Sequence, residues 1–367
     1  MRHAGRFLVG KAPPPRGVRE IPVAILADVT VDGPTPGGGK FPEAAPGRYP
    51  DAPPPAKRAE SPTMNSKPGD ALVVEDIHMS YGDVRAVNGV SFSVRQGEFF
   101  GILGPNGAGK TTTLEIAEGL RKPDSGTVRL LGESPWPRNV RLLPRIGVQL
   151  QASAFFEKLT AREQLETFGA LYGCPPERAL EMLELVGLAE KAGTPDNKLS
   201  GGQRQRLSIA CALVHDPDIV FLDEPTAGLD PQSRRNLWDV LRAIKARGKT
   251  IVYTTHYLDE AEILCDRVAI MDHGKILALD SPTALVRDLD AATRVSLNTG
   301  ILAEEEARRL PGVESVSVDE LSLTISTRTP APVLTALAER RALDGLQVRT
   351  ATLEDVFLEL TGREYRA

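Results

Sequence analysis

Segment 104–111 has the residue types and spacing best suited to chemistry. It consists, in order, of Gly104, Pro105, Asn106, Gly107, Ala108, Gly109, Lys110 and Thr111. These residues fit the pattern G-x-x-x-x-G-K-[ST], whose glycines let successive backbone N–H groups converge on one anion. Lys110 would reach the outer phosphates of a nucleotide, Thr111 would ligate Mg²⁺, and Thr112 would lie in a helix whose N-terminus faces the same anion. The segment therefore predicts the binding of a nucleotide triphosphate.

Two acids at the end of the apolar run 219–222 form a second chemical feature. Asp223 would hold Mg²⁺ opposite Thr111, directly or through water. Glu224 would lie near the γ-phosphate, where a carboxylate can orient and polarise an attacking water. Acids are common at strand ends, so this pair gains its meaning from the phosphate loop upstream. Together the two segments predict a hydrolytic site.

Segment 199–203 narrows the predicted hydrolytic nucleotide site to one protein family. It consists of Leu199, Ser200, Gly201, Gly202 and Gln203. A serine and two glycines at a helix start offer a hydroxyl and bare N–H groups to an anion, although in an isolated S-G-G the serine would be interpreted as an ordinary N-cap. With this segment, region 71–280 resembles the ATP-binding-cassette family, whose signature sequence it matches. The resemblance implies that the motif completes the ATP site of a second copy, in a head-to-tail homodimer.

Other family positions can be matched one by one. Tyr81 resembles the aromatic residue that stacks on adenine, and Asp230 resembles the aspartate that crosses the dimer interface. Gln151 resembles the glutamine that joins Mg²⁺ to the transmembrane partner, although Gln149 lies on the same face of an extended chain. His256 follows the apolar run 250–254 and resembles the histidine that contacts the γ-phosphate. These matches are implied by the resemblance.

The resemblance implies three overlapping sets of site residues. It also implies an active ATPase, because Glu224 is retained. The catalytic set is Glu224, His256 and Gln151. The magnesium ligands are Thr111, Gln151 and Asp223. The ATP-binding set is Tyr81, Gly104, Pro105, Asn106, Gly107, Ala108, Gly109, Lys110, Thr111, Thr112, Ser200, Gly201, Gly202, Gln203 and Asp230.

Composition limits the function classes. The chain has 367 residues, 41% of them hydrophobic, with a formal net charge of −5. This balance argues against a general nucleic-acid binder, which usually presents a basic face. No run approaches the roughly 18 apolar residues of a membrane-spanning helix, so a membrane role would need another chain. The three cysteines are far apart, which predicts reduced thiols in a cytosolic protein.

Three regions are expected. Region 1–66 is rich in proline and glycine and is predicted to be disordered; alternatively, translation begins at Met64. Region 71–285 is predicted to be an α/β P-loop NTPase cassette with a mixed sheet and a helical subdomain at about 152–215. Region 291–367 is predicted to be a small α+β appendage of ferredoxin-like order β-α-β-β-α-β followed by a final helix.

Spacing favours a transporter motor over a soluble ATPase that acts on DNA or ribosomes. About 90 residues separate Lys110 from Ser200, without the coiled coil of the DNA-acting branch, and the chain holds one cassette, whereas the ribosome-acting branch carries two. Segment 354–362 resembles the ending of cassettes of the drug- and antibiotic-export branch, which pair with a separate six-helix permease. Leu353, Phe357 and Leu360 could instead simply pack the appendage core. Import, or lipid and polysaccharide transport, remains the alternative to export.

The resemblance also predicts where the partner binds. The cassette would lie at the inner face of the cell membrane, attached through the permease. Region 152–173 should form the subdomain that receives the permease's cytoplasmic helix. Phe155 and Phe156 would either make that contact or belong to the subdomain core.

Overall fold

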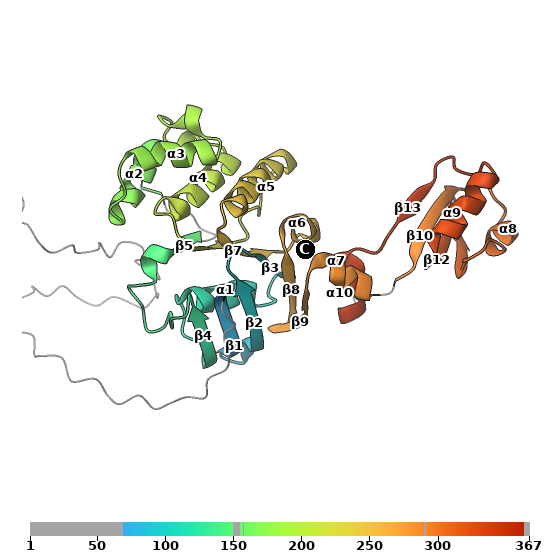
Figure 1. Ribbon diagram of the computed structural model, residues 1–367, viewed down its shortest axis with the longest axis horizontal. Helices are drawn as coiled ribbons and strands as arrows, with labels where there is room; N and C mark the ends of the chain where they lie inside the picture. The colour runs from blue at the N-terminus through green and yellow to red at the C-terminus, as the bar shows by residue number, and fades with distance from the viewer. Residues whose placement is uncertain (1–68, 150–154, 157, 290, 363–367) are drawn as a thin grey trace, which may run out of the picture. The chain divides into compact units, whose positions relative to one another are not determined.

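The computed structural model describes residues 69–149, 155–156, 158–289 and 291–362 (Figure 1). The predicted N-terminal extension, 1–66, and the candidate magnesium ligand Gln151 lie outside the described residues. Within them, the chain forms an α/β region over 70–289, here called the cassette region, and a smaller α+β region over 293–349, here called the appendage.

A six-stranded mixed sheet forms the centre of the cassette region. Its order is β5-β6-β7-β3-β8-β9, and all neighbours run parallel except β8 and β9, which run antiparallel. The strands are β3 (Phe99–Leu103), β5 (Ile146–Gln149), β6 (Ile219–Asp223), β7 (Thr250–Thr255), β8 (Arg267–Asp272) and β9 (Lys275–Asp280). Strands β3, β6 and β7 are buried along their whole length, as expected for parallel strands covered on both faces.

Successive residues of each central strand belong to two different cores. Phe99 and Tyr253 join the core beneath the helices α2 to α5, whereas Phe100 and Val252 join the core on the opposite face. This alternation follows from the two-residue period of a strand. It lets two apolar layers pack on one sheet, so the carboxyl ends of β3, β6 and β7 are held firmly at one edge.

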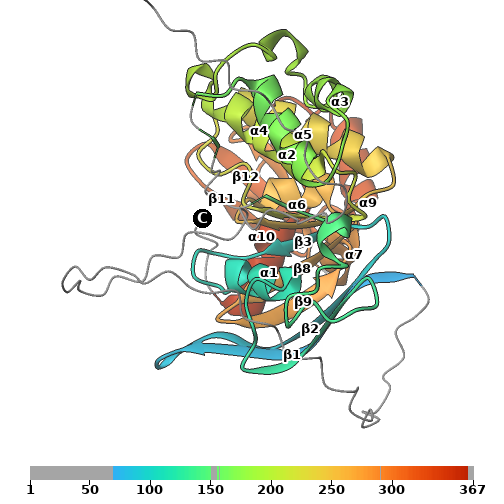
Figure 2. The ribbon, with the colours of Figure 1, turned by 90° about the vertical axis from the view of Figure 1, so that its left-hand side faces the viewer.

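The second layer contains helix α1 and a three-stranded antiparallel sheet. This sheet has the order β2-β1-β4 and comprises β1 (Asp70–Tyr81), β2 (Val84–Arg95) and β4 (Ser125–Leu130). Helix α1 (Lys110–Glu118) lies between the two sheets and contacts both (Figures 1 and 2). Its apolar residues Leu114 and Ile116 are buried in the same core as Phe92 and Phe100.

Helices α4 and α5 lie on the other face of the six-stranded sheet, and α2 and α3 pack against α4 (Figure 1). They are α2 (Ala161–Leu171), α3 (Glu177–Leu185), α4 (Gly201–Leu213) and α5 (Pro231–Ala246), with short 3₁₀ turns at Leu143–Arg145, Ala189–Lys191 and Asp196–Lys198. A capping box is present at the start of α2, where Thr160 and Glu163 bond reciprocally. Phe155 packs against this core, and Phe156 is exposed and lies 5.7 Å from Phe168, ring to ring. The α/β cassette fold with a mixed sheet is confirmed.

The appendage has the ferredoxin-like strand order that the sequence predicted. Its antiparallel sheet has the order β11-β12-β10-β13 and one core, built around residues such as Val295, Leu323 and Leu337. The elements are β10 (Thr293–Asn298), α8 (Glu304–Arg308), β11 (Ser315–Val318), β12 (Ser322–Thr327), α9 (Pro330–Glu339) and β13 (Gln347–Arg349).

The final helix belongs to the cassette region, although it was expected within an appendage over 291–367. Helix α10 (Leu353–Thr361) buries Leu353 and Phe357 in one core with Leu103 and Ile270 of the central sheet. The backbone N–H of Leu353 also donates to the carboxylate of Glu262 in α6 (Leu258–Leu264), at 2.8 Å. Helix α7 (Pro282–Asp288) contacts α10 as well. The chain therefore returns to the cassette region after the appendage.

Candidate functional site

The predicted phosphate loop joins the carboxyl end of β3 to α1, and two of its glycines are required by close backbone approaches. Gly109 has a φ of +100°, and a Cβ there would lie 2.2 Å from the carbonyl oxygen of Ala86. A Cβ on Gly104 would lie 2.2 Å from the carbonyl oxygen of Met271. Because Gly109 is the N-cap of α1, no side chain caps the helix. Its first N–H groups therefore face an anion site.

The other predicted loop residues divide between an exposed tip and a buried base. Asn106 and Gly107 are exposed, and Thr112 is half-buried in α1. Ala108 is buried, and its carbonyl oxygen accepts a hydrogen bond from the backbone N–H of Gly274 at 2.9 Å. The base of the loop is thus anchored to the turn after β8, while its tip stays accessible.

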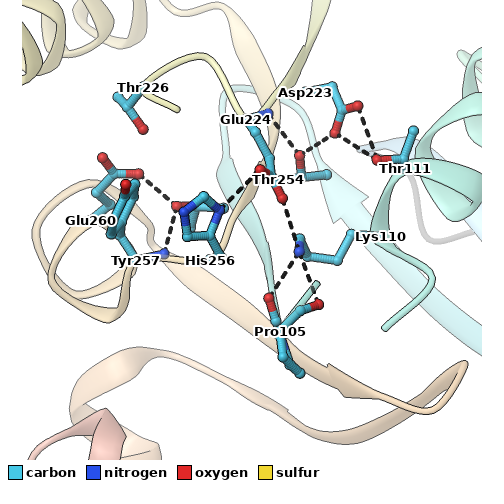
Figure 3. Close-up of polar contacts among 12 residues, drawn as sticks. Pro105, Lys110, Thr111, Asp223, Glu224, Thr226, Thr254, His256, Tyr257 and Glu260 are labelled. Carbon is cyan, nitrogen blue, oxygen red and sulfur yellow. Dashed lines mark hydrogen bonds and ion pairs between the residues drawn. The ribbon is translucent and has the colours of Figure 1, made fainter. Parts of the chain in front are cut away.

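Lys110 is buried and bound to three oxygen acceptors (Figure 3). Its Nζ donates to the carbonyl oxygens of Gly104 at 2.9 Å and Pro105 at 3.2 Å. The same Nζ lies 2.9 Å from Oε1 of Glu224. These acceptors offset the cost of removing an ammonium from water. The lysine therefore links the phosphate loop to the candidate catalytic acid.

Asp223 and Thr111 meet as expected for two ligands of one magnesium ion. The Thr111 hydroxyl donates to Oδ2 of Asp223 at 3.1 Å, and the Thr254 hydroxyl donates to Oδ1 at 2.5 Å. Burial raises the pKa of Asp223 against the hydrogen bonds from the two threonines, and the nearby Glu224 raises it further. A bound divalent cation would offset the cost of burying the ionised Asp223 carboxylate, and hard oxygen donors suit Mg²⁺. The residues present therefore fit the ion.

Glu224 lies between a lysine and a histidine. Besides Lys110, it contacts His256, whose Nδ1 is 2.9 Å from Oε2. Burial raises the pKa of Glu224, but Lys110 and His256 outweigh this effect and leave the pKa below its usual range. The backbone of Glu224 has a φ of +43°, a sparsely populated conformation for a residue with a side chain. Strained backbone of this kind is common at functional sites.

The sequence did not single out Thr254, which joins the two acids. Its hydroxyl donates to Asp223 and accepts from the backbone N–H of Glu224 at 2.9 Å. Strands β6 and β7 are parallel neighbours, with Asp223 opposite Thr254. The available signal was its position near the end of an apolar run, since the ends of parallel strands share one edge.

The signature segment is placed as a capped helix start. Ser200 caps α4: its hydroxyl accepts from the backbone N–H of Gln203 at 3.3 Å, and its own N–H donates to Oε1 of Gln203 at 2.9 Å. The ordinary N-cap role is therefore present. Among the described residues, no hydrogen bond or ion pair joins Ser200 or Gln203 to Lys110.

The two glycines of the signature segment differ in their surroundings. Gly201 is exposed, and a Cβ there would meet nothing within 4 Å. Gly202 is buried, and a Cβ there would lie 2.7 Å from the side chain of Ser233. Asp230 caps α5 and accepts from the Ser233 hydroxyl at 2.6 Å and its N–H at 2.9 Å. Gly202 of the signature segment and Asp230 therefore both lie next to Ser233.

The candidate adenine-binding residue lies at the end of β1. Tyr81 is 42% exposed, which leaves ring surface accessible for stacking. The guanidinium of Arg121 lies 5.3 Å from its ring centroid and is paired with Glu115 at 2.7 Å. The sequence did not single out Arg121. Gln149 is buried at the end of β5, and Gln151 lies outside the described residues.

Comparison with known proteins gives close relatives. A family described as "ABC transporter" matches residues 87–227. The chain is 41% identical to Nod factor export ATP-binding protein I of Ralstonia nicotianae, over 80% of this chain and 95% of that protein. It is 39% identical to the linearmycin resistance ATP-binding protein LnrL of Bacillus subtilis, over 80% of this chain and 99% of that protein.

Solved structures of ABC transporter components are also similar to this chain. Protein cbiO1 of Clostridium perfringens, part of an ABC transporter complex, is 30% identical with a TM-score of 0.55, covering 60% of this chain and 95% of that chain. A dimeric post-hydrolysis ATP-binding cassette bound to ADP and Pi is 29% identical with a TM-score of 0.52, covering 57% of this chain and 98% of that chain. No helix in the described residues has the length and apolar character needed to cross a membrane.

Proposed function

Because this chain belongs to the ABC transporter family as an ATP-binding subunit, we propose that it hydrolyses ATP to drive export of a small molecule through a separate membrane permease. One observation carries the enzymatic part. The carboxylate of Glu224 lies 2.9 Å from both Lys110 and His256, at the sheet edge where Thr111 meets Asp223. In the proposal, this edge brings together a phosphate-binding loop, the donors for a magnesium ion and a general base.

Each polar residue at this edge has a chemical role in the proposal. Thr111 and Asp223 would hold Mg²⁺, which, when bound, neutralises phosphate charge and acts as a Lewis acid. Lys110 and the first N–H groups of α1 would bind the β- and γ-phosphates. Glu224 would accept the proton of the attacking water, and His256 would keep the carboxylate oriented.

The lysine contact suggests how the base is kept idle until ATP arrives. Lys110 now neutralises Glu224, which also lowers the pKa of that carboxyl. A γ-phosphate would compete for the same ammonium, because phosphate carries more charge than one carboxylate. Release of Oε1 would leave an oxygen free to orient water, while Oε2 stays with His256.

The signature segment supports a head-to-tail homodimer. Ser200, Gly201 and Gln203 are not bonded to the chain's own phosphate loop, and the exposed Gly201 leaves room for an approaching anion. In this proposal they complete the ATP site of the partner copy, and Asp230 lies at the dimer interface. Gln151 would join the magnesium site to the permease.

The relatives support the direction of transport. Two of them carry names that specify Nod factor export and linearmycin resistance, and the chain spans 95% or more of each. Import, lipid or polysaccharide transport, and soluble action on DNA or ribosomes are the less supported alternatives. The subunit would act at the cytoplasmic face of the membrane, attached through its permease.

Replacement of Glu224 by Gln tests the enzymatic proposal. We expect Glu224→Gln to bind ATP, to lose at least about a hundredfold in kcat and to trap an ATP-bound dimer, because the amide cannot take a proton from water. Steady-state hydrolysis with Mg²⁺ and size-exclusion chromatography with ATP would measure both effects. The control Glu166→Gln alters a surface pair with Arg162 and should retain the wild-type rate. Hydrolysis by Glu224→Gln within about threefold of wild type would reject Glu224 as the base.

A further inference from the structure

Glu260, in the first turn of α6, is a fully buried carboxylate surrounded by donors. It is 0% exposed, and its Oε2 accepts from the Tyr253 hydroxyl at 2.6 Å and the Thr255 hydroxyl at 2.6 Å. The indole N–H of Trp238, from α5, donates to Oε1 at 3.4 Å. Burial of a carboxylate is costly, and three converging donors are the compensation it requires.

The proton positions in this cluster can be assigned. Tyr253 has one proton, which goes to Glu260, so the Thr226 hydroxyl at 3.4 Å must donate to the Tyr253 oxygen. Thr255 gives its proton to Glu260 and accepts from the backbone N–H of Tyr257 at 2.9 Å. Burial and the Glu260 charge raise the pKa of Tyr253, which keeps the phenol protonated. The cluster therefore has two branches, one from Thr226 through Tyr253 and one from Tyr257 through Thr255, and both end at the Glu260 carboxylate.

The two branches begin at two functional segments (Figure 3). Thr226 follows Glu224 by two residues and opens the segment that ends at Asp230, the N-cap of α5. Thr255 and Tyr257 flank His256, so their bonds fix the peptide that carries the imidazole. The guanidinium of Arg234, also on α5, lies 4.8 Å from the Tyr257 ring centroid. Helix α5 and the His256 segment are thus held together at this cluster.

We infer that Glu260 is a positioning residue, which holds His256 within reach of Glu224 and couples it to segment 226–230. The inference rests on the proposed ATP hydrolysis and adds a residue to it. Thr226 is joined to Glu260 through Tyr253, Trp238 of α5 contacts Glu260 directly, and Glu260 is joined through Thr255 to the backbone on both sides of His256. Glu260 does not touch the reacting atoms; it acts through His256.

Two variants test this role. Glu260→Gln keeps the side-chain volume but removes the charge that organises the donors, and Tyr253→Phe removes only the hydroxyl shared with Thr226. Tyr253→Phe keeps its ring in the core and remains testable if Glu260→Gln folds poorly. We expect kcat to fall roughly tenfold to a hundredfold for Glu260→Gln, with KM for ATP within about twofold, because misplacement of a catalytic group costs rate rather than phosphate binding.

A matched control is available at the opposite edge of the sheet. Glu98 is also buried, pairs with Arg267 at 3.3 Å and accepts from the backbone N–H of Arg95 at 2.7 Å. Glu98→Gln should leave kcat per folded molecule unchanged. A general loss of structure would lower both glutamine variants equally. Of the two glutamine variants, only Glu260→Gln should lose kcat. The double variant with His256→Ala should lose no more kcat than His256→Ala by itself.

A second readout does not depend on ATP turnover. The imidazole carbon-bound proton signal of His256, assigned by comparison with His256→Ala, should shift in Glu260→Gln and Tyr253→Phe but not in Glu98→Gln. Absence of hydrolysis by the wild type would contradict the proposed function, and the NMR shift would still decide the inference. An unmoved His256 signal, or kcat losses that add in the double variant, would overturn it.

Discussion

The acids buried around the phosphate loop differ in how their charge is compensated. Glu224 faces Lys110 and His256, and Glu260 accepts from three donors. Glu118, at the end of α1, is buried, and its Oε2 has no hydrogen-bond partner among the described residues. Burial raises the pKa of Glu118 well above its usual range, and the charges of Asp223 and Glu115 add to this. This carboxyl should therefore be protonated in the folded protein.

A raised folded-state pKa makes stability depend on pH. The unfolded chain loses the Glu118 proton near pH 4.3, whereas the folded chain keeps it, so the free energy of unfolding falls as pH rises through the folded-state pKa. Glu118→Gln is neutral at every pH and lacks this slope. We expect its stability relative to wild type to be higher at pH 8 than at pH 5. Urea unfolding at both values measures the difference, with Glu166→Gln, which alters only a surface pair with Arg162, as the control; equal differences at pH 5 and 8 would contradict a protonated Glu118.

The motifs predicted most of the residues that meet at the site, but not those that join them. Lys110, Thr111 and Asp223 were singled out from local spacing, and in the structure Thr111 contacts Asp223 while Lys110 contacts Glu224. Thr254 and Glu260 act through strands and helices that adjoin only in the folded chain, so no local pattern marked them.

At the scale of elements, α10 shows what periodicity can and cannot predict. The apolar spacing of Leu353 and Phe357 correctly indicated a helix with one buried face. It could not indicate the partner, because the sequence order places this helix directly after β13. The partner is the core around Leu103 and Ile270. The element order of the appendage could be predicted from its succession of apolar runs, although β10 pairs with β12 and β13, which follow it only after α8 and α9 respectively.

The packing of α10 predicts that its apolar face stabilises the cassette region. Phe357 is 1% exposed, so Phe357→Ala should cost about 3–5 kcal/mol and speed hydrogen exchange in β8, which contributes to the same core. Leu358, on the same helix, is 43% exposed. Leu358→Ala is the control and should change stability by less than about 1 kcal/mol. Protection in β8 that is equal in the two variants would show that α10 does not support this core.

At the scale of the whole molecule, the site of one chain is incomplete in the proposed mechanism. In that mechanism one chain supplies a loop, magnesium donors and a base, while among the described residues no hydrogen bond or ion pair joins its signature segment to its own Lys110. A head-to-tail dimer would contain two sites, each with the loop of one copy and the signature of the other. Hydrolysis should then depend steeply on protein concentration, because association completes the site.

Mixing two inactive variants tests this arrangement directly. Lys110→Ala removes the loop cation, and Gly201→Glu places a carboxylate where the partner's phosphate would lie, in a position with no atom within 4 Å to clash. Each variant alone should be inactive. In an equimolar mixture about half of the dimers are mixed, and each mixed dimer has one intact site of two, so about a quarter of the wild-type rate should return. Neither variant gains when mixed with more of itself, which is the control. A mixture that stays inactive while dimers form would mean that loop and signature act within one chain.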